Sequence, residues 1–195
     1  MQHIQAVVFD LDGTLVSSSL DFEAMRYDLG CPPTEDILAF LAQLPAEQKP
    51  KAAEIVREHE MRDAESSFWL PAAKEFVEAC NARSIPMAIV TRNSAIPTQV
   101  KLARNGIPIQ PVFTREMTPP KPDPAAILTI AEQWRLPTSA VMMVGDYKYD
   151  LQAGRNANAA TCLVNFAELP AYASELADYT FANFAMLHSA FFVDR

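Results

Sequence analysis

The sequence predicts an α/β protein built on a doubly wound parallel sheet, with a small helical segment inserted near its start. From residue 71 onward, short apolar runs typical of buried strands alternate with amphipathic helical patterns. Between residues 17 and 70 the strand-like runs are absent, and only helical spacing remains. Several apolar runs end at a polar residue. In open parallel sheets the carboxyl ends of the strands form the ligand crevice, so a site is expected there.

The first predicted strand covers residues 4–9, a Val-rich run that leads into Asp10 and Asp12. Because side chains alternate along a strand, these two aspartates are expected on the same side. Two neighbouring carboxylates are costly at the end of an apolar strand unless a cation lies between them or one is protonated. Asp-Gly is also common in simple turns, so this segment alone indicates a divalent cation site and a turn about equally well.

Residues 17–70 are predicted to hold three or four helices. Apolar residues recur at helical spacing from Phe22 and again from Ile37, the second time after a helix start signal at residues 34–36. The charged stretch 51–65 predicts a solvent-exposed helix.

Helix and strand patterns alternate after Pro71. Asp10, Thr91 and Asp146 each fall at the carboxyl end of a predicted strand, so we expect these three side chains to meet at one edge of the sheet. The predicted helices are 73–80, 96–105, 123–134 and 148–156, and the predicted strands are 86–91, 111–114, 141–146, 160–164 and an edge strand at 178–181.

Composition limits the possible partners. The formal net charge of -8 argues against nucleic acid or an acidic membrane surface as the main partner, since both attract basic proteins. The N-terminal segment lacks a signal-peptide pattern, and no apolar run is long enough to span a membrane. The cysteines Cys31, Cys80 and Cys162 are odd in number and lack C-x-x-C spacing, which indicates reduced thiols of a cytoplasmic protein.

Four motifs in order resemble those of the haloacid dehalogenase superfamily, and the resemblance covers the whole chain. The first runs from Asp10 to Leu15 and the second ends at Thr91. The third contains Lys121 between prolines, and the fourth runs from Gly145 to Asp150. Taken alone, a lysine in a proline-rich loop is usually only solvated, but the neighbouring motifs reverse that interpretation.

The resemblance implies a Rossmann-like core domain of residues 1–16 and 71–195, with residues 17–70 as a helical cap domain. That cap is similar to the small cap of the phosphoglycolate phosphatase and β-phosphoglucomutase-like branch. It also implies a cytoplasmic Mg²⁺-dependent phosphatase, which hydrolyses a small phosphorylated metabolite of the phosphoglycolate or sugar phosphate type through an aspartyl-phosphate intermediate.

The resemblance assigns roles to the carboxylates. Asp10 would be the nucleophile, and Asp12 would be the general acid and then the general base. Mg²⁺ would bind the carboxylates of Asp10 and Asp146 and the backbone carbonyl of Asp12, while Asp150 would orient the groups around it. An aspartate at position 12 favours phosphate ester chemistry, because dehalogenases and phosphonatases lack one there.

The phosphate would be bound by Thr91 and by Lys121, which is expected to pair with Asp10. Arg92 and Asn93 are expected to reach the substrate, although a helix cap explains Asn93 about equally well. Lys148 is interpreted as a solvated surface lysine rather than as a cation beside the phosphate.

Two alternative functions remain open at this point. The first is a phosphomutase, which ranks lower because no histidine lies near residues 17–20. The second is a non-catalytic binding or regulatory module with the same fold. The sequence does not identify the substrate, the cap residues that select it or the oligomeric state.

Overall fold

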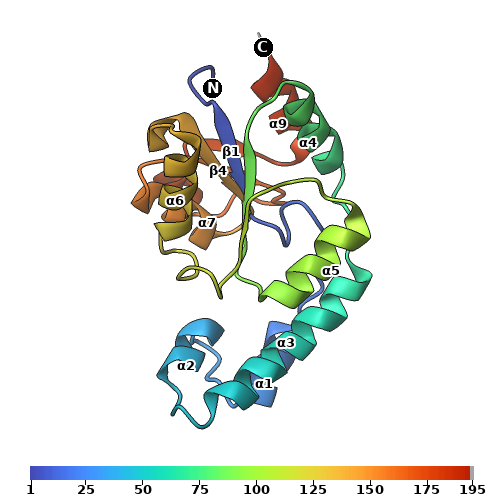
Figure 1. Ribbon diagram of the computed structural model, residues 1–195, viewed down its shortest axis with the longest axis vertical. Coiled ribbons are helices and arrows are strands. Elements are labelled where there is room, and N and C mark those ends of the chain that lie inside the picture. The colour runs from blue at the N-terminus through green and yellow to red at the C-terminus, as the bar shows by residue number, and fades with distance from the viewer. Residues whose placement is uncertain (194–195) are drawn as a thin grey trace.

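The computed structural model describes residues 1–193 and contains a six-stranded parallel sheet (Figure 1). The strands follow the order β3-β2-β1-β4-β5-β6, so the chain winds outward from β1 in both directions. This is the predicted Rossmann-like α/β fold. The strands are β1 (Ala6–Phe9), β2 (Met87–Val90), β3 (Val112–Phe113), β4 (Val141–Gly145), β5 (Ala160–Val164) and β6 (Tyr179–Phe181).

Strand β1 lies at the centre of the sheet, where both of its faces are covered. Val8 pairs with Ala88 of β2 on one side and with Met143 of β4 on the other. All four residues of β1 are fully buried, which explains why the run is apolar at every position instead of alternating.

Helices cover both faces of the sheet. Phe9 contacts the rings of Phe76 from α4 and Phe184 from α9 on one face, whereas Val8 packs with Ile127 of α6 on the other. The helices are α1 (Phe22–Leu29), α2 (Ile37–Gln43), α3 (Lys49–Ser66), α4 (Ala73–Ala82), α5 (Ala95–Asn105), α6 (Ala125–Trp134), α7 (Lys148–Asn156), α8 (Ala173–Leu176), α9 (Phe184–Phe192) and the short 3-10 helix η1 (Thr138–Ala140).

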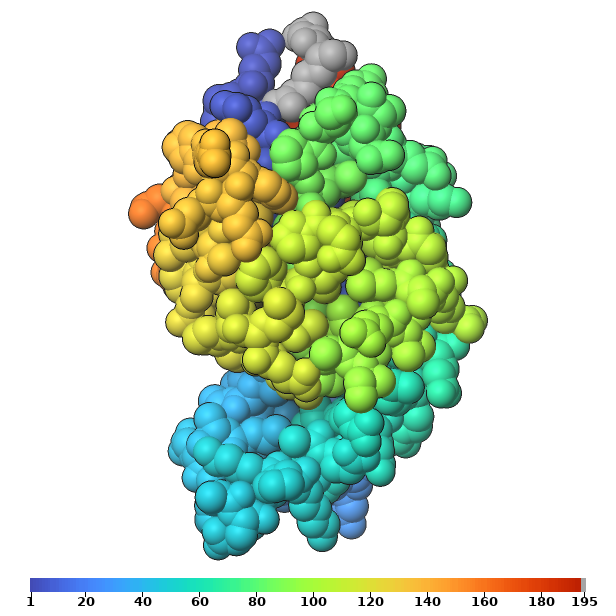
Figure 2. Space-filling model, viewed as in Figure 1, coloured from blue at the N-terminus to red at the C-terminus, as the bar shows by residue number. Residues whose placement is uncertain are grey.

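Helices α1, α2 and α3 lie beyond the carboxyl ends of the strands, away from both termini (Figure 1). The space-filling view shows them as a separate lobe below the rest of the molecule, although the long helix α3 runs upward beside α5 (Figure 2). The chain passes from the sheet to these helices and back again at one place, where the Ser17 amide donates to the carbonyl of Phe68 at 2.8 Å. The division at residues 16/17 and 70/71 into two domains remains a prediction.

The predicted strands are all present, with differences of one or two residues at some ends. Helices α8 and α9 were not predicted, and α9 completes the core through Phe184 and Phe191. The expectation of an exposed helix over residues 51–65 is wrong for one side of α3. Glu60 and Asp63 are buried there, because cations from other elements pair with them. Among residues 1–193, no helix is both long and apolar enough to cross a bilayer.

Candidate active site

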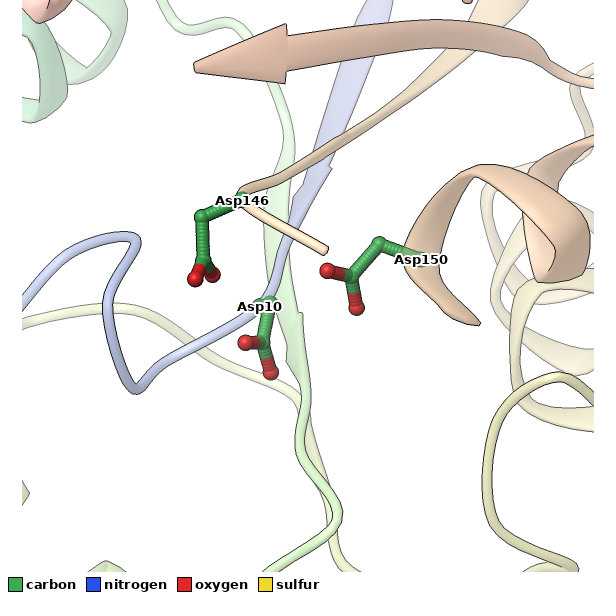
Figure 3. A group of neighbouring side chains, drawn as sticks. All are labelled: Asp10, Asp146 and Asp150. Carbon is green, nitrogen blue, oxygen red and sulfur yellow. The ribbon is translucent and has the colours of Figure 1, made fainter. Parts of the chain in front are cut away.

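Three carboxylates converge at the carboxyl edge of the sheet. Asp10 follows β1, Asp146 follows β4, and Asp150 lies in the first turn of α7. One oxygen from each lies within 4.8 Å of the others, and Figure 3 shows the three side chains pointing toward one another. Asp10 and Asp146 therefore meet as expected. Asp150, expected only to orient the groups around the metal, belongs to the same cluster.

Two glycines make room for this cluster. A Cβ atom on Gly13, whose φ is +73°, would lie 2.4 Å from Oδ2 of Asp146. A Cβ atom on Gly145 would lie 2.3 Å from the Cγ atom of Asp150. Thr14 then orients Asp146, because its hydroxyl donates to Oδ1 of that carboxylate at 2.7 Å. Gly13 is thus required both by its left-handed backbone and by close approach, and Gly145 by close approach alone.

Lys121 lies between two of these carboxylates with only 1% of its side chain exposed. Its Nζ atom is 2.5 Å from Oδ1 of Asp10 and 2.7 Å from Oδ1 of Asp150. Burial opposes the charged form, but Asp10 and Asp150 raise the pKa of Lys121 above its usual range. The expected pairing of Lys121 with Asp10 is present.

One lysine leaves this group of three carboxylates short of positive charge. Burial, followed by the nearby charges of Asp10 and Asp150, raises the pKa of Asp146 to about 8. Burial is also the largest cause that raises the pKa of Asp150 to about 6. A divalent cation among these groups would remove that penalty. The side-chain atoms that could bind the cation are all carboxylate oxygens, which are the ligands that a hard cation such as Mg²⁺ prefers.

The carboxylate of Asp12 lies outside this cluster and is held from two sides. Its Oδ1 atom accepts a bond from Lys101, and its Oδ2 atom accepts one from the side-chain amide of Asn93. Burial raises the pKa of Asp12 to about 6, against the opposing effect of Lys101. The pKa of Asp12 is therefore close to neutral, which suits general acid and base chemistry.

The residues after β2 take part in the site in different ways. Thr91 is buried, and its hydroxyl accepts a bond from the backbone amide of Asn93 at 3.1 Å. Arg92 binds Asp36 at the start of α2 at 2.6 Å and lies over the ring of Tyr149, with its Cζ atom 4.4 Å from the ring centroid. Arg92 thus joins the sheet edge to the helical segment.

A cavity of about 610 Å³ lies between the carboxylates and the helices α1, α2 and α3. Lys148, expected as a freely solvated residue, lines this cavity with its Nζ atom 5.3 Å from the ring centroid of Tyr149. Half of the side chains that residues 17–70 contribute to the cavity are apolar. They include Leu20, Phe22, Met25, Ile37, Leu38 and Val56.

Sequence reasoning missed four charged residues beside the site: Lys101, Asp63, Glu60 and Arg115. Lys101 pairs with Asp63 at 2.5 Å, and Arg115 pairs with Glu60. A signal was present for the acidic pair, because Glu60 and Asp63 are three residues apart and share one face of a helix. Lys101 gave no comparable signal, because its burial one turn after Thr98 of α5 is visible only in the structure.

Comparisons with known proteins add a family-level finding. The family profile described as haloacid dehalogenase-like hydrolase matches residues 26–164. A haloacid dehalogenase-like hydrolase domain-containing protein of Arabidopsis thaliana is 30% identical over an alignment of 174 positions, which covers 83% of this chain and 71% of that protein. A phosphoglycolate phosphatase of Chromobacterium violaceum is 26% identical over 85% of this chain and 87% of its own.

The fold is also found among solved structures. A hydrolase from Pseudomonas syringae superposes with a TM-score of 0.80 at 20% identity, over 96% of this chain and 97% of that one. At this identity the similarity concerns the fold alone.

Proposed function

This chain belongs to the haloacid dehalogenase-like hydrolases, and within that family we propose that it is a Mg²⁺-dependent phosphatase of a small phosphomonoester. The proposal rests above all on one observation: Lys121 lies between Asp10 and Asp150, with Asp146 beside them, at the cavity wall. A cation and an excess of carboxylates at one place suit the binding of a metal ion and of an anionic phosphoryl group.

Asp10 is the proposed nucleophile. One of its oxygens attacks phosphorus, the bond from phosphorus to the leaving oxygen breaks, and an aspartyl-phosphate forms on Asp10. Asp12 gives a proton to the leaving oxygen in this step. In the second step Asp12 takes a proton from water, the water oxygen binds phosphorus, and the Asp10 carboxylate and phosphate are released.

Lys121 and Thr91 would bind the phosphoryl group. Lys121 supplies positive charge where negative charge collects on the phosphoryl oxygens. Thr91 places a buried hydroxyl at the same edge of the sheet. Asp10, Asp146 and the backbone carbonyl of Asp12 would hold Mg²⁺, with Asp150 beside them. The ion would reduce the repulsion between the carboxylate nucleophile and the phosphate.

The leaving group would lie in the cavity under α1 and α2. The apolar side chains there would exclude bulk water from the ester. The similarity to a phosphoglycolate phosphatase supports a small phosphorylated metabolite as the substrate.

The first experiment is phosphate release from a panel of phosphorylated metabolites, with Mg²⁺ and with the metal removed by a chelator. We expect release from at least one phosphomonoester, and a loss of at least about 1,000-fold for Asp10→Asn, since removal of a nucleophile leaves little catalysis. Asp21→Asn is the matched control, because Asp21 caps α1 and asparagine caps a helix equally well.

The result also separates the alternatives. A non-catalytic module would release no phosphate from any ester in the panel. A phosphomutase would return an isomeric phosphate ester instead of inorganic phosphate.

We also propose that the protein works in the cytoplasm. Its cysteines Cys31 and Cys162 are buried free thiols, as suits a reducing compartment.

A further inference from the structure

Lys101 is a fully buried lysine in the middle of α5, and its charged group touches two carboxylates. The Nζ atom lies 2.5 Å from Oδ2 of Asp63 and also bonds Oδ1 of Asp12. The side chain of Lys101 is 0% exposed, and that of Asp63 is 2% exposed. A lysine in such a place needs both partners, because burying an ammonium group without a counter-charge is strongly unfavourable.

The arrangement repeats the one around Lys121. Each aspartate of the pair Asp10 and Asp12 contacts a buried lysine, and each of these lysines also contacts a carboxylate from another part of the chain. For Lys121 the second carboxylate is Asp150 of α7. For Lys101 it is Asp63, which belongs to α3 in the helical segment.

Asp63 is itself firmly held. Its Oδ1 atom accepts bonds from the backbone amide and the hydroxyl of Ser19, and its Oδ2 atom accepts a bond from the hydroxyl of Ser18 at 3.2 Å. The chain that links β1 to α1 is therefore tied to Asp63. Lys101 is fixed by that anchored carboxylate on one side and holds Asp12 on the other.

We propose that Lys101 is a positioning residue for the acid and base chemistry of Asp12, a role that rests on the proposed phosphatase function. Lys101 holds Oδ1 of Asp12 while Asn93 holds Oδ2, so the two bonds together fix the side-chain torsions of Asp12. Lys101 acts through Asp12 and does not itself touch the ester.

A purely structural role for Lys101 makes a different prediction. If Lys101 only neutralised the buried charge of Asp63, removing both charges together would restore a stable and active protein, because a neutral pair avoids the cost of an unpaired buried ion. If Lys101 positions Asp12, removing both charges would restore stability and leave the catalytic defect.

The experiment compares two esters. p-Nitrophenyl phosphate has a good leaving group that departs without protonation, whereas an alkyl phosphate needs a proton on its leaving oxygen. As the alkyl ester we would use the alkyl phosphate of the metabolite panel that the wild-type protein hydrolyses fastest. The value of kcat/KM is measured for both, because it reports the steps up to release of the leaving group. Asp12→Asn supplies the reference pattern for loss of the proton donor.

We expect Lys101→Met to lower kcat/KM by about 100-fold or more for the alkyl ester and by less than about tenfold for the aryl ester, in line with the usual size of general acid catalysis. The double variant Asp63→Asn/Lys101→Met should unfold at a higher temperature than Lys101→Met and show the same selective loss. Asp63→Asn alone keeps Lys101 beside Asp12, so its ratio between the two esters should stay close to that of the wild type.

A further test is a double-mutant cycle between Lys101→Met and Asp12→Asn. If Lys101 acts through Asp12, the combined variant should be no slower on the alkyl ester than Asp12→Asn alone. Losses that multiply would overturn the proposal, as would equal losses on the two esters. Recovery of alkyl ester hydrolysis in Asp63→Asn/Lys101→Met would also overturn it. If Lys101→Met fails to fold, the double variant carries the test.

Failure of the proposed function itself gives a different result. In that case the wild-type protein hydrolyses neither ester, or Asp10→Asn retains its turnover. A wild-type enzyme that loses activity with Asp10→Asn but shows no selective loss at Lys101 refutes the positioning role alone.

Discussion

Binding of Mg²⁺ at pH 7 is expected to release about one proton, and that proton should come from Asp146. The pKa of Asp146 is raised to about 8 by burial and by the charges of Asp10 and Asp150. A group with this pKa is about 90% protonated at pH 7, and a metal ligand must give up its proton. Asp12 and Asp150, with pKa values of about 6, are each only about 10% protonated at that pH, so they add little.

The assay is a calorimetric titration of the metal-free protein with MgCl₂ in two buffers of different ionisation enthalpy. The difference between the two apparent enthalpies gives the number of protons released. We expect about 0.9 proton at pH 7 and about 0.1 at pH 9, since Asp146 is already ionised at the higher pH. Asp146→Asn should bind Mg²⁺ more weakly and release few protons, whereas Asp21→Asn should behave as the wild type.

The same pKa shift predicts how stability changes with pH in the absence of metal. Because the pKa of Asp146 rises on folding, from 3.8 to about 8, the folded state binds more protons than the unfolded state between these values. The contribution of Asp146 to the free energy of unfolding therefore falls as pH rises from about 4 to about 8, by about 6 kcal/mol at 1.36 kcal/mol per pKa unit. Asp12 and Asp150, whose pKa values are also raised, lower the stability in the same direction up to about pH 6. Mg²⁺ binding that releases no protons at pH 7, or the same release from Asp146→Asn, would refute this reasoning.

Three further predictions concern the cluster, the helical segment and the thiols. Gly13→Ala should abolish turnover, because its Cβ atom would lie 2.4 Å from Oδ2 of Asp146 and would displace that carboxylate. Overpacking of this kind costs about 1–3 kcal/mol beyond the cost of the left-handed backbone. Gly30→Ala, at φ +65° with nothing within 4 Å, should cost only about 1–2 kcal/mol, so urea unfolding of the two variants isolates the clash. Arg92→Met should raise KM more than it lowers kcat in steady-state kinetics, since the bond to Asp36 is lost. Arg62→Met is the matched control, because Arg62 lies on the exposed side of α3 and donates to the carbonyl of Glu58 in its own helix. Burial raises the pKa of Cys31 and Cys162 above the usual range, so these two thiols should react slowly with Ellman's reagent in the native protein and at once in 6 M guanidinium chloride. Fast reaction of the two thiols in the native protein would contradict their buried placement.

The sheet and the carboxylate cluster could be predicted because both depend on local signals in the chain. A run such as Ala6–Phe9, apolar at every position, indicates a strand covered on two faces, and the polar residue after each strand falls at the ligand edge. Helix α9 was missed although it is strongly apolar. The apolar side of this helix packs against Phe76, whose ring contacts Phe184 and Phe191. These residues are more than 100 positions from Phe76 along the chain, so the local sequence does not reveal the contact.

The lysines show the limit of such reasoning most clearly. Lys121 stands between prolines in a recognisable motif, so its pairing with Asp10 could be predicted. Lys101 lies in an ordinary amphipathic helix, where lysine is usually on the solvated face. Its partner Asp63 lies on α3, a helix whose charge pattern predicts exposure along its length. The spacing of Glu60 and Asp63 places both acids on one face of α3, but nothing in either segment indicates that Lys101 of α5 pairs with Asp63, because that contact depends on how the two helices pack.

These buried pairs also limit how the helical segment can move. A rigid rotation of residues 17–70 away from the sheet would separate Lys101 from Asp63 and Arg115 from Glu60, and each broken pair would leave buried charges at a cost of about 3–5 kcal/mol. The ion pair of Arg92 and Asp36 on α2 is about one quarter exposed, so opening it costs about 1 kcal/mol or less. Separate movement of α1 and α2 would also have to pull Met25 and Ile37 away from Val56 of α3, with which they form one buried apolar cluster. The buried ion pairs therefore hold α3 to the core, and the apolar cluster holds α1 and α2 to α3.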